Sequence, residues 1–251
     1  MNTVKLSNDT PTALITGSAK RIGAVIARFL HQVGFRVIIH YRHSKEQARL
    51  LCDELNALRT NSAILMALNL NEISQIQKKI PLALANENTL DLLVNCASDY
   101  FPTTLEETTV DQWQALLNSN LTGPYFLIQA CLPYLKKARG NIVNILDINA
   151  IKPIANFAIY CAAKAGLAML TKALAIDLAP HIRVNGVAPG ITLWAENDDE
   201  VPIAKRDAII AAIPLQKLVD PIDIAKAVLF LQQTASMTGE IIRVDGGRLL
   251  R

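Results

Sequence analysis

The chain has 251 residues, of which 51% are hydrophobic and 19% are charged, so it can bury a sizeable core. The sequence has no linker-like or low-complexity stretch, and we expect one domain over residues 1–251. A formal net charge of +3 is too small to favour a nucleic-acid surface. Charges such as Lys172 and Asp177 interrupt the apolar stretches, and residues 1–11 lack the apolar core of a signal peptide. We therefore expect neither nucleic-acid nor membrane partners.

The cysteines favour an intracellular protein. They form no CxxC pair and no Cys/His cluster with the spacing of metal ligands. These residues are Cys52, Cys96, Cys131 and Cys161. We expect reduced thiols, no metal site and a cytoplasmic location.

The first half of the chain alternates short apolar runs, which predict strands, with amphipathic stretches, which predict helices. The predicted strands are Thr12–Ile15, Phe35–Ile39, Ala63–Leu68 and Leu90–Val94. The predicted helices are Ile22–Val33, Ser44–Arg59 and Ile73–Leu84.

The second half continues this alternation. A long helix is predicted with a break near Gly123-Pro124, and a loop is predicted over Pro189–Ile203. The other predicted elements, in chain order with that long helix first, are Trp113–Lys137, Asn141–Leu146, Phe157–Leu178, Arg183–Val187, Asp223–Gln232 and Glu240–Val244. Apolar strands that alternate with helices predict an α/β fold, namely a doubly wound, Rossmann-type parallel sheet of about seven strands with helices on both faces. Ligands of such sheets bind at the carboxyl ends of the strands.

A glycine-containing turn joins the first predicted strand to the first predicted helix. It reads Thr-Gly-Ser-Ala-Lys-Arg-Ile-Gly over residues 16–23. Glycine lets the backbone turn tightly and approach a phosphate, and the start of the following helix offers free N–H groups. The turn therefore predicts a nucleotide-phosphate site.

The segment after the second predicted strand indicates which nicotinamide cofactor binds. Enzymes that select NAD commonly place a carboxylate here to bind the ribose 2′-hydroxyl. Residues 40–44 read His-Tyr-Arg-His-Ser and contain no carboxylate. Arg42, His43 and Ser44 instead suit a 2′-phosphate, and we expect NADPH rather than NADH.

Tyr160 and Lys164 lie four residues apart in a predicted helix, and this spacing places them on one helix face. An adjacent ammonium group stabilises a phenolate and lowers the pKa of the tyrosine. We therefore expect Tyr160 to act as a general acid or base near neutral pH.

With these motifs in this order, the chain resembles the short-chain dehydrogenase/reductase family over residues 12–251. That family's turn reads Thr-Gly-x-x-x-Gly-x-Gly, and Arg21 replaces its middle glycine, as in the pteridine reductase branch. Residues 95–98, Asn-Cys-Ala-Ser, stand where the family has Asn-Asn-Ala-Gly. Residues 238–247 match its last strand and turn.

Asp147 stands thirteen residues before Tyr160, where the family usually carries serine. A serine hydroxyl suits a carbonyl substrate because it donates to the developing oxyanion, which an ionised aspartate would repel. Pteridine and dihydromonapterin reductases carry aspartate here, so the resemblance implies reduction of a 7,8-dihydropterin with a proton delivered to a ring nitrogen. It also implies that Asn120 holds a water that links Lys164 to solvent.

The resemblance implies a set of binding residues. Those expected to bind the cofactor are Gly17, Ser18, Arg21, Ile22, Gly23, Tyr41, Arg42, His43, Ser44, Asn69, Leu70, Asn95, Ala97, Ser98, Tyr160, Lys164, Pro189, Gly190 and Ile191. Those expected to bind substrate are Arg21, Ser98, Tyr100, Phe101, Asp147, Tyr160, Leu193 and Trp194. Either Tyr100 or Phe101 can stack on a pterin, and Phe101 fits equally well in the core. The acidic residues of the loop, Glu196, Asp198 and Asp199, suit either substrate selection or a solvated surface.

Two other functions remain open at the level of sequence. One is a carbonyl or 3-oxoacyl reductase of the same family, against which Asp147 argues. The other is a non-catalytic NADPH-binding protein, against which Tyr160, Lys164 and Asn120 argue. The resemblance further implies a homotetramer, for which the apolar helices Trp113–Lys137 and Phe157–Leu178 are the expected interface.

Overall fold

Seven short apolar runs form one parallel sheet in a computed structural model that describes residues 10–194 and 203–251. The strands are β1 (Thr12–Ile15), β2 (Arg36–Tyr41), β3 (Ala63–Ala67), β4 (Leu92–Asn95), β5 (Asn141–Ile145), β6 (Arg183–Pro189) and β7 (Ile241–Val244). Their order in the sheet is β3-β2-β1-β4-β5-β6-β7, and every neighbouring pair is parallel. This confirms the predicted doubly wound sheet.

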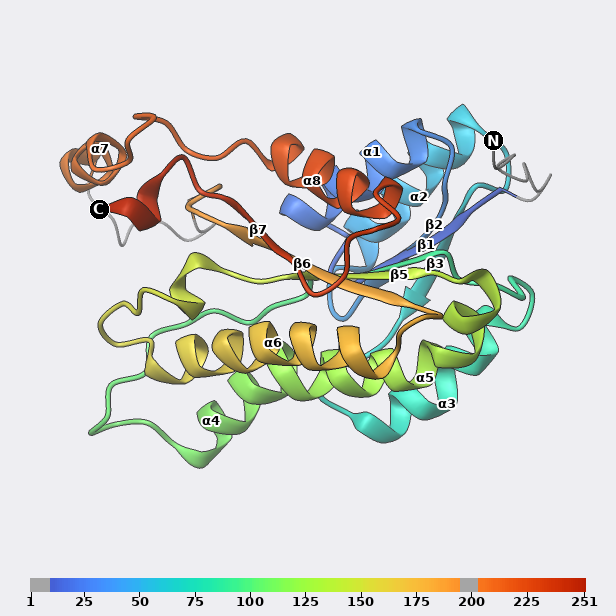
Figure 1. Ribbon diagram of the computed structural model, residues 1–251, viewed down its shortest axis with the longest axis horizontal. Helices are drawn as coiled ribbons and strands as arrows, with labels where there is room; N and C mark the ends of the chain where they lie inside the picture. The colour runs from blue at the N-terminus through green and yellow to red at the C-terminus, as the bar shows by residue number, and fades with distance from the viewer. Residues whose placement is uncertain (1–9, 195–202) are drawn as a thin grey trace.

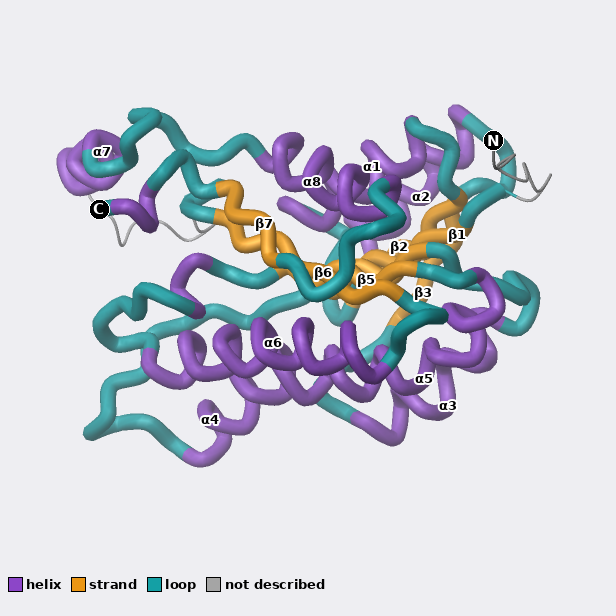
Figure 2. Tube along the Cα trace, in the orientation of Figure 1, coloured by secondary structure: helices purple, strands orange, loops and turns teal. Residues whose placement is uncertain are grey.

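Helices cover both faces of the sheet (Figures 1 and 2). One face carries α1 (Arg21–Gln32), α2 (Lys45–Leu58) and α8 (Pro221–Gln233). The other carries α3 (Ile73–Leu84), α4 (Val110–Leu117), α5 (Gly123–Ala138) and α6 (Ala158–Asp177). Side chains of a strand alternate between these layers, so Ala13 and Ile15 pack into one hydrophobic core and Leu14 into the other.

The structure differs from the predicted elements in four places. The predicted break near Gly123-Pro124 is a π-helical turn, η1 (Asn118–Thr122), which joins α4 to α5 without an interruption. Three short helices among the described residues were not predicted: the 3-10 turn η2 (Ile148–Ala150), α7 (Ile203–Ala211) and the C-terminal 3-10 turn η4 (Arg248–Leu250). Of these, α7 and η4 lie at the end of the molecule where the chain terminates (Figure 1).

Among the described helices, α6 alone is long and apolar enough to cross a membrane by length and composition. In the structure it forms part of the helical layer beside the sheet (Figure 1). It also buries polar side chains, among them Tyr160, Lys164 and Thr171. Its buried face accounts for part of its apolar character, and exposed side chains such as Met169 account for the rest.

Candidate active site

The carboxyl ends of the seven strands and the loops that follow them line a cavity of about 860 Å³. Its size lies toward the upper end of the range for ligand pockets, about 300–1,000 Å³. The expected site residues that line it are Gly17, Arg21, Ile22, Gly23, Tyr41, Arg42, His43, Ser44, Leu70, Ala97, Ser98, Tyr100, Asp147, Tyr160, Lys164, Pro189, Gly190, Ile191, Leu193 and Trp194. The expected site residues outside the lining are Ser18, Asn69, Asn95, Phe101 and Asn120.

The turn between β1 and α1 requires glycine at two positions. Gly17 adopts a positive φ of 64°, and a Cβ there would lie 2.9 Å from the Cα of Ala97. A Cβ at Gly23 would lie 2.4 Å from the carbonyl oxygen of Gly17. The N-cap residue of α1, Lys20, makes no side-chain cap. An uncapped helix N-terminus beside a close-packed glycine turn fits a nucleotide phosphate.

His40 fastens this turn to the sheet, a role that the sequence analysis missed. Its Nδ1 accepts a hydrogen bond from the N–H of Gly17 at 2.9 Å, and its Nε2 donates to the carbonyl of Leu68 at 3.0 Å. These two partners fix the tautomer of a neutral ring. Burial lowers the pKa of His40 to about 4, against the opposing effect of the Leu68 hydrogen bond. The Ser18 hydroxyl adds a second link, since it accepts from the His40 N–H and donates to the Ile15 carbonyl.

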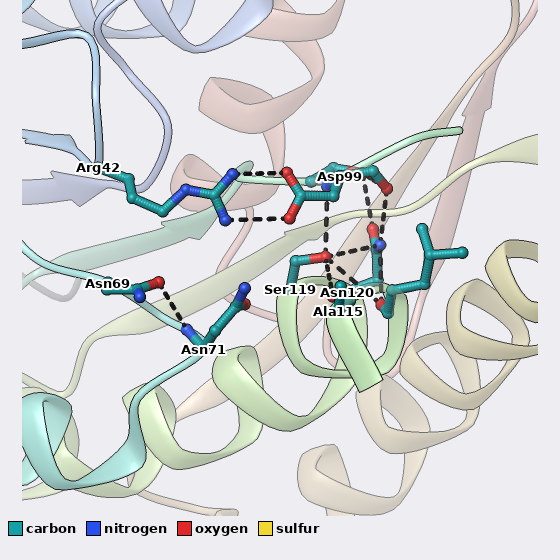
Figure 3. Close-up of polar contacts among 9 residues, drawn as sticks. Arg42, Asn69, Asn71, Asp99, Ala115, Ser119 and Asn120 are labelled. Atoms are coloured by element: carbon teal, nitrogen blue, oxygen red, sulfur yellow. Dashed lines mark hydrogen bonds and ion pairs between the residues drawn. The ribbon is translucent and has the colours of Figure 1, made fainter. Parts of the chain in front are cut away.

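Asn69 and Asn95 support the surroundings of the cavity. The side chain of Asn69 donates to Glu72 and accepts from the N–H of Asn71 in the turn before α3 (Figure 3). Asn95 donates to the side chain of Asn144 on the neighbouring strand, at 2.8 Å. Their described contacts are thus with neighbouring protein groups.

Arg42, expected to bind the 2′-phosphate, is engaged with a carboxylate in the structure. Its guanidinium makes two parallel hydrogen bonds of 3.0 Å to Asp99 (Figure 3). The Asp99 backbone is held in turn by η1, because its N–H donates to Ser119 and its carbonyl accepts from Asn120. The pair thus links the loops that follow β2 and β4, at the segment expected to bind the 2′-phosphate.

Asn120 holds the loop after β4. Its Nδ2 donates to the carbonyl of Asp99 at 2.9 Å, and its Oδ1 accepts from the hydroxyl of Ser98 at 2.6 Å. The described contacts do not include one between Asn120 and Lys164. The expected water relay through Asn120 therefore stays a prediction, and its visible role is to position residues 98 and 99.

The partly buried Asp147 and the buried Tyr160 form a hydrogen-bonded pair. The Tyr160 hydroxyl donates to Oδ2 of Asp147 at 2.7 Å, and Oδ1 accepts from the N–H of Asn149 at 2.8 Å. Burial raises the pKa of Asp147, although these two hydrogen bonds oppose the rise. The pKa of Tyr160 is raised well above its usual value, first by burial and then by the charge of Asp147. The expectation that Lys164 lowers the Tyr160 pKa is therefore wrong for the protein alone, because desolvation and the neighbouring carboxylate dominate.

Lys164 is a buried cation near Tyr160. It is 3% exposed, and its Nζ donates to the carbonyl of Ile145 at 3.0 Å. The same nitrogen lies 5.8 Å from the centre of the Tyr160 ring. Burial lowers the pKa of Lys164, while the charge of Asp147 opposes this effect. The ammonium thus lies close enough to Asp147 to feel its charge, and the described contacts include no direct ion pair between them.

Tyr100 rather than Phe101 provides the aromatic wall of the cavity. Its ring stacks on Phe157 with centroids 4.5 Å apart and meets the Tyr160 ring edge-on at 4.8 Å. About half of Tyr100 remains exposed. Phe101 instead packs against the core cluster that includes Leu116.

Arg21 closes one side of the cavity. Its guanidinium donates to the carbonyl oxygens of Trp194 at 2.9 Å and of Leu193 at 3.2 Å. Its backbone has a positive φ of 55°, which explains why a glycine suits this position in the family's usual turn. The acidic residues 196, 198 and 199 lie outside the described residues. A further cation in the lining, Arg248, was not identified from the sequence.

Comparison with known proteins identifies the family. A family model described as enoyl-(acyl carrier protein) reductase matches residues 17–248. The chain is 32% identical to pteridine reductase 1 of Leishmania tarentolae, over 94% of this chain and 96% of that protein. It is 31% identical to a 3-oxoacyl-(acyl-carrier-protein) reductase of Staphylococcus aureus, over 95% and 98%. The nucleotide-type turn, the Tyr160–Lys164 pair and these matches agree, and the chain belongs to the short-chain dehydrogenase/reductase family of oxidoreductases.

Proposed function

We propose that this protein is an NADPH-dependent pteridine reductase that converts a 7,8-dihydropterin to the tetrahydropterin. The observation that carries the proposal is the 2.7 Å hydrogen bond from Tyr160 to Asp147. It directs the tyrosine hydroxyl to a partly buried carboxyl group, whereas a carbonyl reductase would use this hydroxyl to bind a substrate oxygen. The raised pKa of Asp147 makes it a better proton donor at neutral pH than an ordinary aspartate.

The proposed reaction adds a hydride to C6 and a proton to N5, so that the C6–N5 double bond becomes a single bond. When bound, NADPH supplies the hydride from C4 of its nicotinamide. Protonated Asp147 donates the proton to N5, and the Tyr160 hydroxyl stabilises the carboxylate that remains by donating to it. The half-exposed ring of Tyr100 offers a flat face on which the heterocycle stacks.

The cavity supports NADPH as the cofactor. Arg42, His43 and Ser44 line it at the end of β2, and a guanidinium binds a 2′-phosphate through parallel hydrogen bonds. One contact opposes the binding of a 2′-phosphate. Asp99 forms an ion pair with Arg42, and its carboxylate would lie close to that phosphate. The preference for NADPH over NADH is therefore expected to depend on how readily Arg42 leaves Asp99.

A 3-oxoacyl reductase is the second candidate, because relatives with that name are as similar to this chain as the pteridine reductase is. Against it, the Tyr160 hydroxyl donates its hydrogen bond to Asp147, whereas carbonyl reduction needs that hydroxyl for the substrate oxygen. A non-catalytic NADPH-binding protein is the third. Against that role, Tyr160, Lys164 and Asp147 all line the same cavity.

The deciding experiment follows NADPH absorbance with purified protein and two substrates in parallel, 7,8-dihydrobiopterin and a 3-oxoacyl thioester. We expect rapid oxidation with the dihydropterin alone, and its loss in Asp147→Ser. Turnover of the thioester alone, kept or improved in Asp147→Ser, would establish the second candidate instead. Tight NADPH binding without turnover of any reductase substrate would favour the third.

We also propose the setting in which the enzyme works. The four cysteines are free, which suits the reducing conditions of the cytoplasm. A homotetramer formed through α5 and α6 is proposed because apolar side chains of both helices line one groove.

A further inference from the structure

The turn at residues 245–249 places the cationic side chain of Arg248 in the proposed substrate site. The carboxylate of Asp245 accepts hydrogen bonds of 2.9 Å from the N–H groups of Gly247 and Leu249. Gly246 and Gly247 adopt positive φ values of 63° and 83°, which allow the chain to reverse here. Arg248 follows at once, so its backbone is fixed by the turn. Figure 1 shows this turn at the same end of the molecule as α7 and the loop between β5 and α6.

The side chain of Arg248 lines the same cavity as Asp147 and Tyr160. Its Nη1 is buried and has no hydrogen-bond partner among the residues that the structure describes. A buried donor without a partner is costly, about 1–3 kcal/mol and more for a charged group. A group that bears a free acceptor would therefore be bound favourably at this position.

We propose that Arg248 recognises the substrate by donating a hydrogen bond to the ring carbonyl oxygen next to the nitrogen that is protonated. The proposal rests on the function proposed above. In a pterin, the C4 carbonyl and N5 lie on the same edge of the ring system, so a ring that presents N5 to Asp147 presents that oxygen on the same side. Arginine has donors only, so it matches a carbonyl oxygen and not a ring N–H or amino group.

The electrostatics of the pair agree with this geometry. The charged and titratable groups that act on Asp147 are Tyr160 and Lys164 from α6, Tyr100 from the loop after β4, and Arg248 from η4. Arg248 and Lys164 lower the pKa of Asp147 and so oppose the effect of burial. Arg248 also lowers the pKa of Tyr100. The guanidinium is thus close enough to both walls of the substrate site to affect their charges.

Three variants test the proposal. Arg248→Met removes the donor, Arg248→Lys keeps the charge, and Arg251→Met is the control at an exposed arginine three residues further along. With 7,8-dihydrobiopterin as substrate, we expect Arg248→Met to raise KM by about 10- to 100-fold, the worth of a hydrogen bond to a charged group. The KM for NADPH should stay within about twofold of wild type, Arg248→Lys should recover part of the loss, and Arg251→Met should match wild type.

A spectroscopic readout separates a local role from general damage. Carboxyl ¹³C NMR of aspartate-labelled, substrate-free protein follows the titration of Asp147, identified by its absence in Asp147→Asn. We expect the Asp147 pKa to rise in Arg248→Met and to change less in Arg248→Lys. Unchanged KM for the dihydropterin in Arg248→Met, or an equal rise in KM for NADPH, would overturn the proposal while leaving the pteridine reductase function intact. Absence of dihydropterin turnover in the wild type would overturn both.

Discussion

At the scale of single residues, Asp147 beside Tyr160 lowers the stability of the folded protein but supplies the proton of the proposed reaction. Burial raises the pKa of Asp147, so the folded protein holds this proton more tightly than the unfolded chain does. The carboxyl group therefore reduces stability increasingly as pH rises from its unfolded pKa, about 3.9, through the folded value. The same ionisation removes the proton that the proposed reaction delivers to N5.

Asp147→Asn should therefore abolish activity and improve stability. An amide keeps the shape and can still bond to Tyr160 and Asn149, but it cannot donate an acidic proton. We expect a fall in kcat of at least about 100-fold with 7,8-dihydrobiopterin. In thermal unfolding, the gain in Tm should be larger at pH 8 than at pH 5. Asp53→Asn, on the exposed face of α2, is the control; a larger gain at pH 5 than at pH 8 would contradict the argument.

Asp99 is expected to weaken the binding of NADPH specifically. A bound 2′-phosphate has to take Arg42 from Asp99 and then lie near its carboxylate. We expect Asp99→Asn to tighten NADPH roughly two- to fivefold, in keeping with the small worth of a half-exposed ion pair, and to leave NADH unchanged. Titration of each cofactor by fluorescence checks this, again with Asp53→Asn as control. Weaker binding of NADPH in Asp99→Asn would show that the carboxylate instead positions Arg42.

At the scale of elements, the strands and most helices could be predicted because their apolar periods are local. The placement of Tyr160 and Lys164 on one helix face could be predicted from their four-residue spacing and from their place in the helix after β5. The pKa values and the ion-pair partners could not be predicted, because they depend on which side chains the fold buries together. The Tyr160 pKa depends on a carboxylate thirteen residues away and on desolvation, and Arg42 is held by Asp99 across two strands. The π-helical turn η1 likewise reflects packing of the loop after β4 against it.

Arg21 joins the start of α1 to the loop after β6. Its left-handed backbone is strained by about 1–2 kcal/mol relative to glycine, while its side chain donates to residues 193 and 194. We expect Arg21→Gly to leave thermal stability unchanged or higher but to raise KM for the dihydropterin. Arg21→Ala, which keeps the strain and loses the contacts, should raise KM similarly and lower Tm. Equal Tm values for the two variants would refute the strain argument.

The glycine turn between β1 and α1 should loosen in acid because His40 must be neutral to accept from Gly17. Its folded pKa of about 4 lies below the usual 6.5, so its contribution is present above pH 6.5 and is lost as pH falls toward 4. The difference between these two pKa values corresponds to about 3 kcal/mol of folding stability. The free energy of unfolding can be measured with urea at pH 6.5 and at pH 4. Between these pH values, we expect it to fall by about 3 kcal/mol less in His40→Gln than in wild type. Equal losses of stability in His40→Gln and in wild type would contradict this role of His40.

At the scale of the whole molecule, the sheet order gathers residues that are far apart in the chain. The glycine turn follows β1, Arg42 follows β2, Tyr100 follows β4, Asp147 follows β5, and Arg248 follows β7. All four of these side chains line one cavity together with Gly17 of the turn. In a parallel sheet all these positions lie at the carboxyl ends of the strands. The topology thus converts a one-dimensional alternation of elements into a single site.

The same fold leaves an apolar groove of about 460 Å³ between α5 and α6. Tyr125 and Met169 line it and are 39% and 65% exposed, and exposed apolar surface of this kind is typical of subunit interfaces. If this groove joins subunits, a charge in it should separate them. We expect Met169→Glu to shift the mass measured by sedimentation from the tetramer toward a smaller species. Leu58→Glu, at a position 74% exposed on α2, should leave the mass unchanged. A tetramer that survives Met169→Glu at micromolar concentration would mean that the subunits meet elsewhere, and a wild-type monomer would mean that the groove has another use.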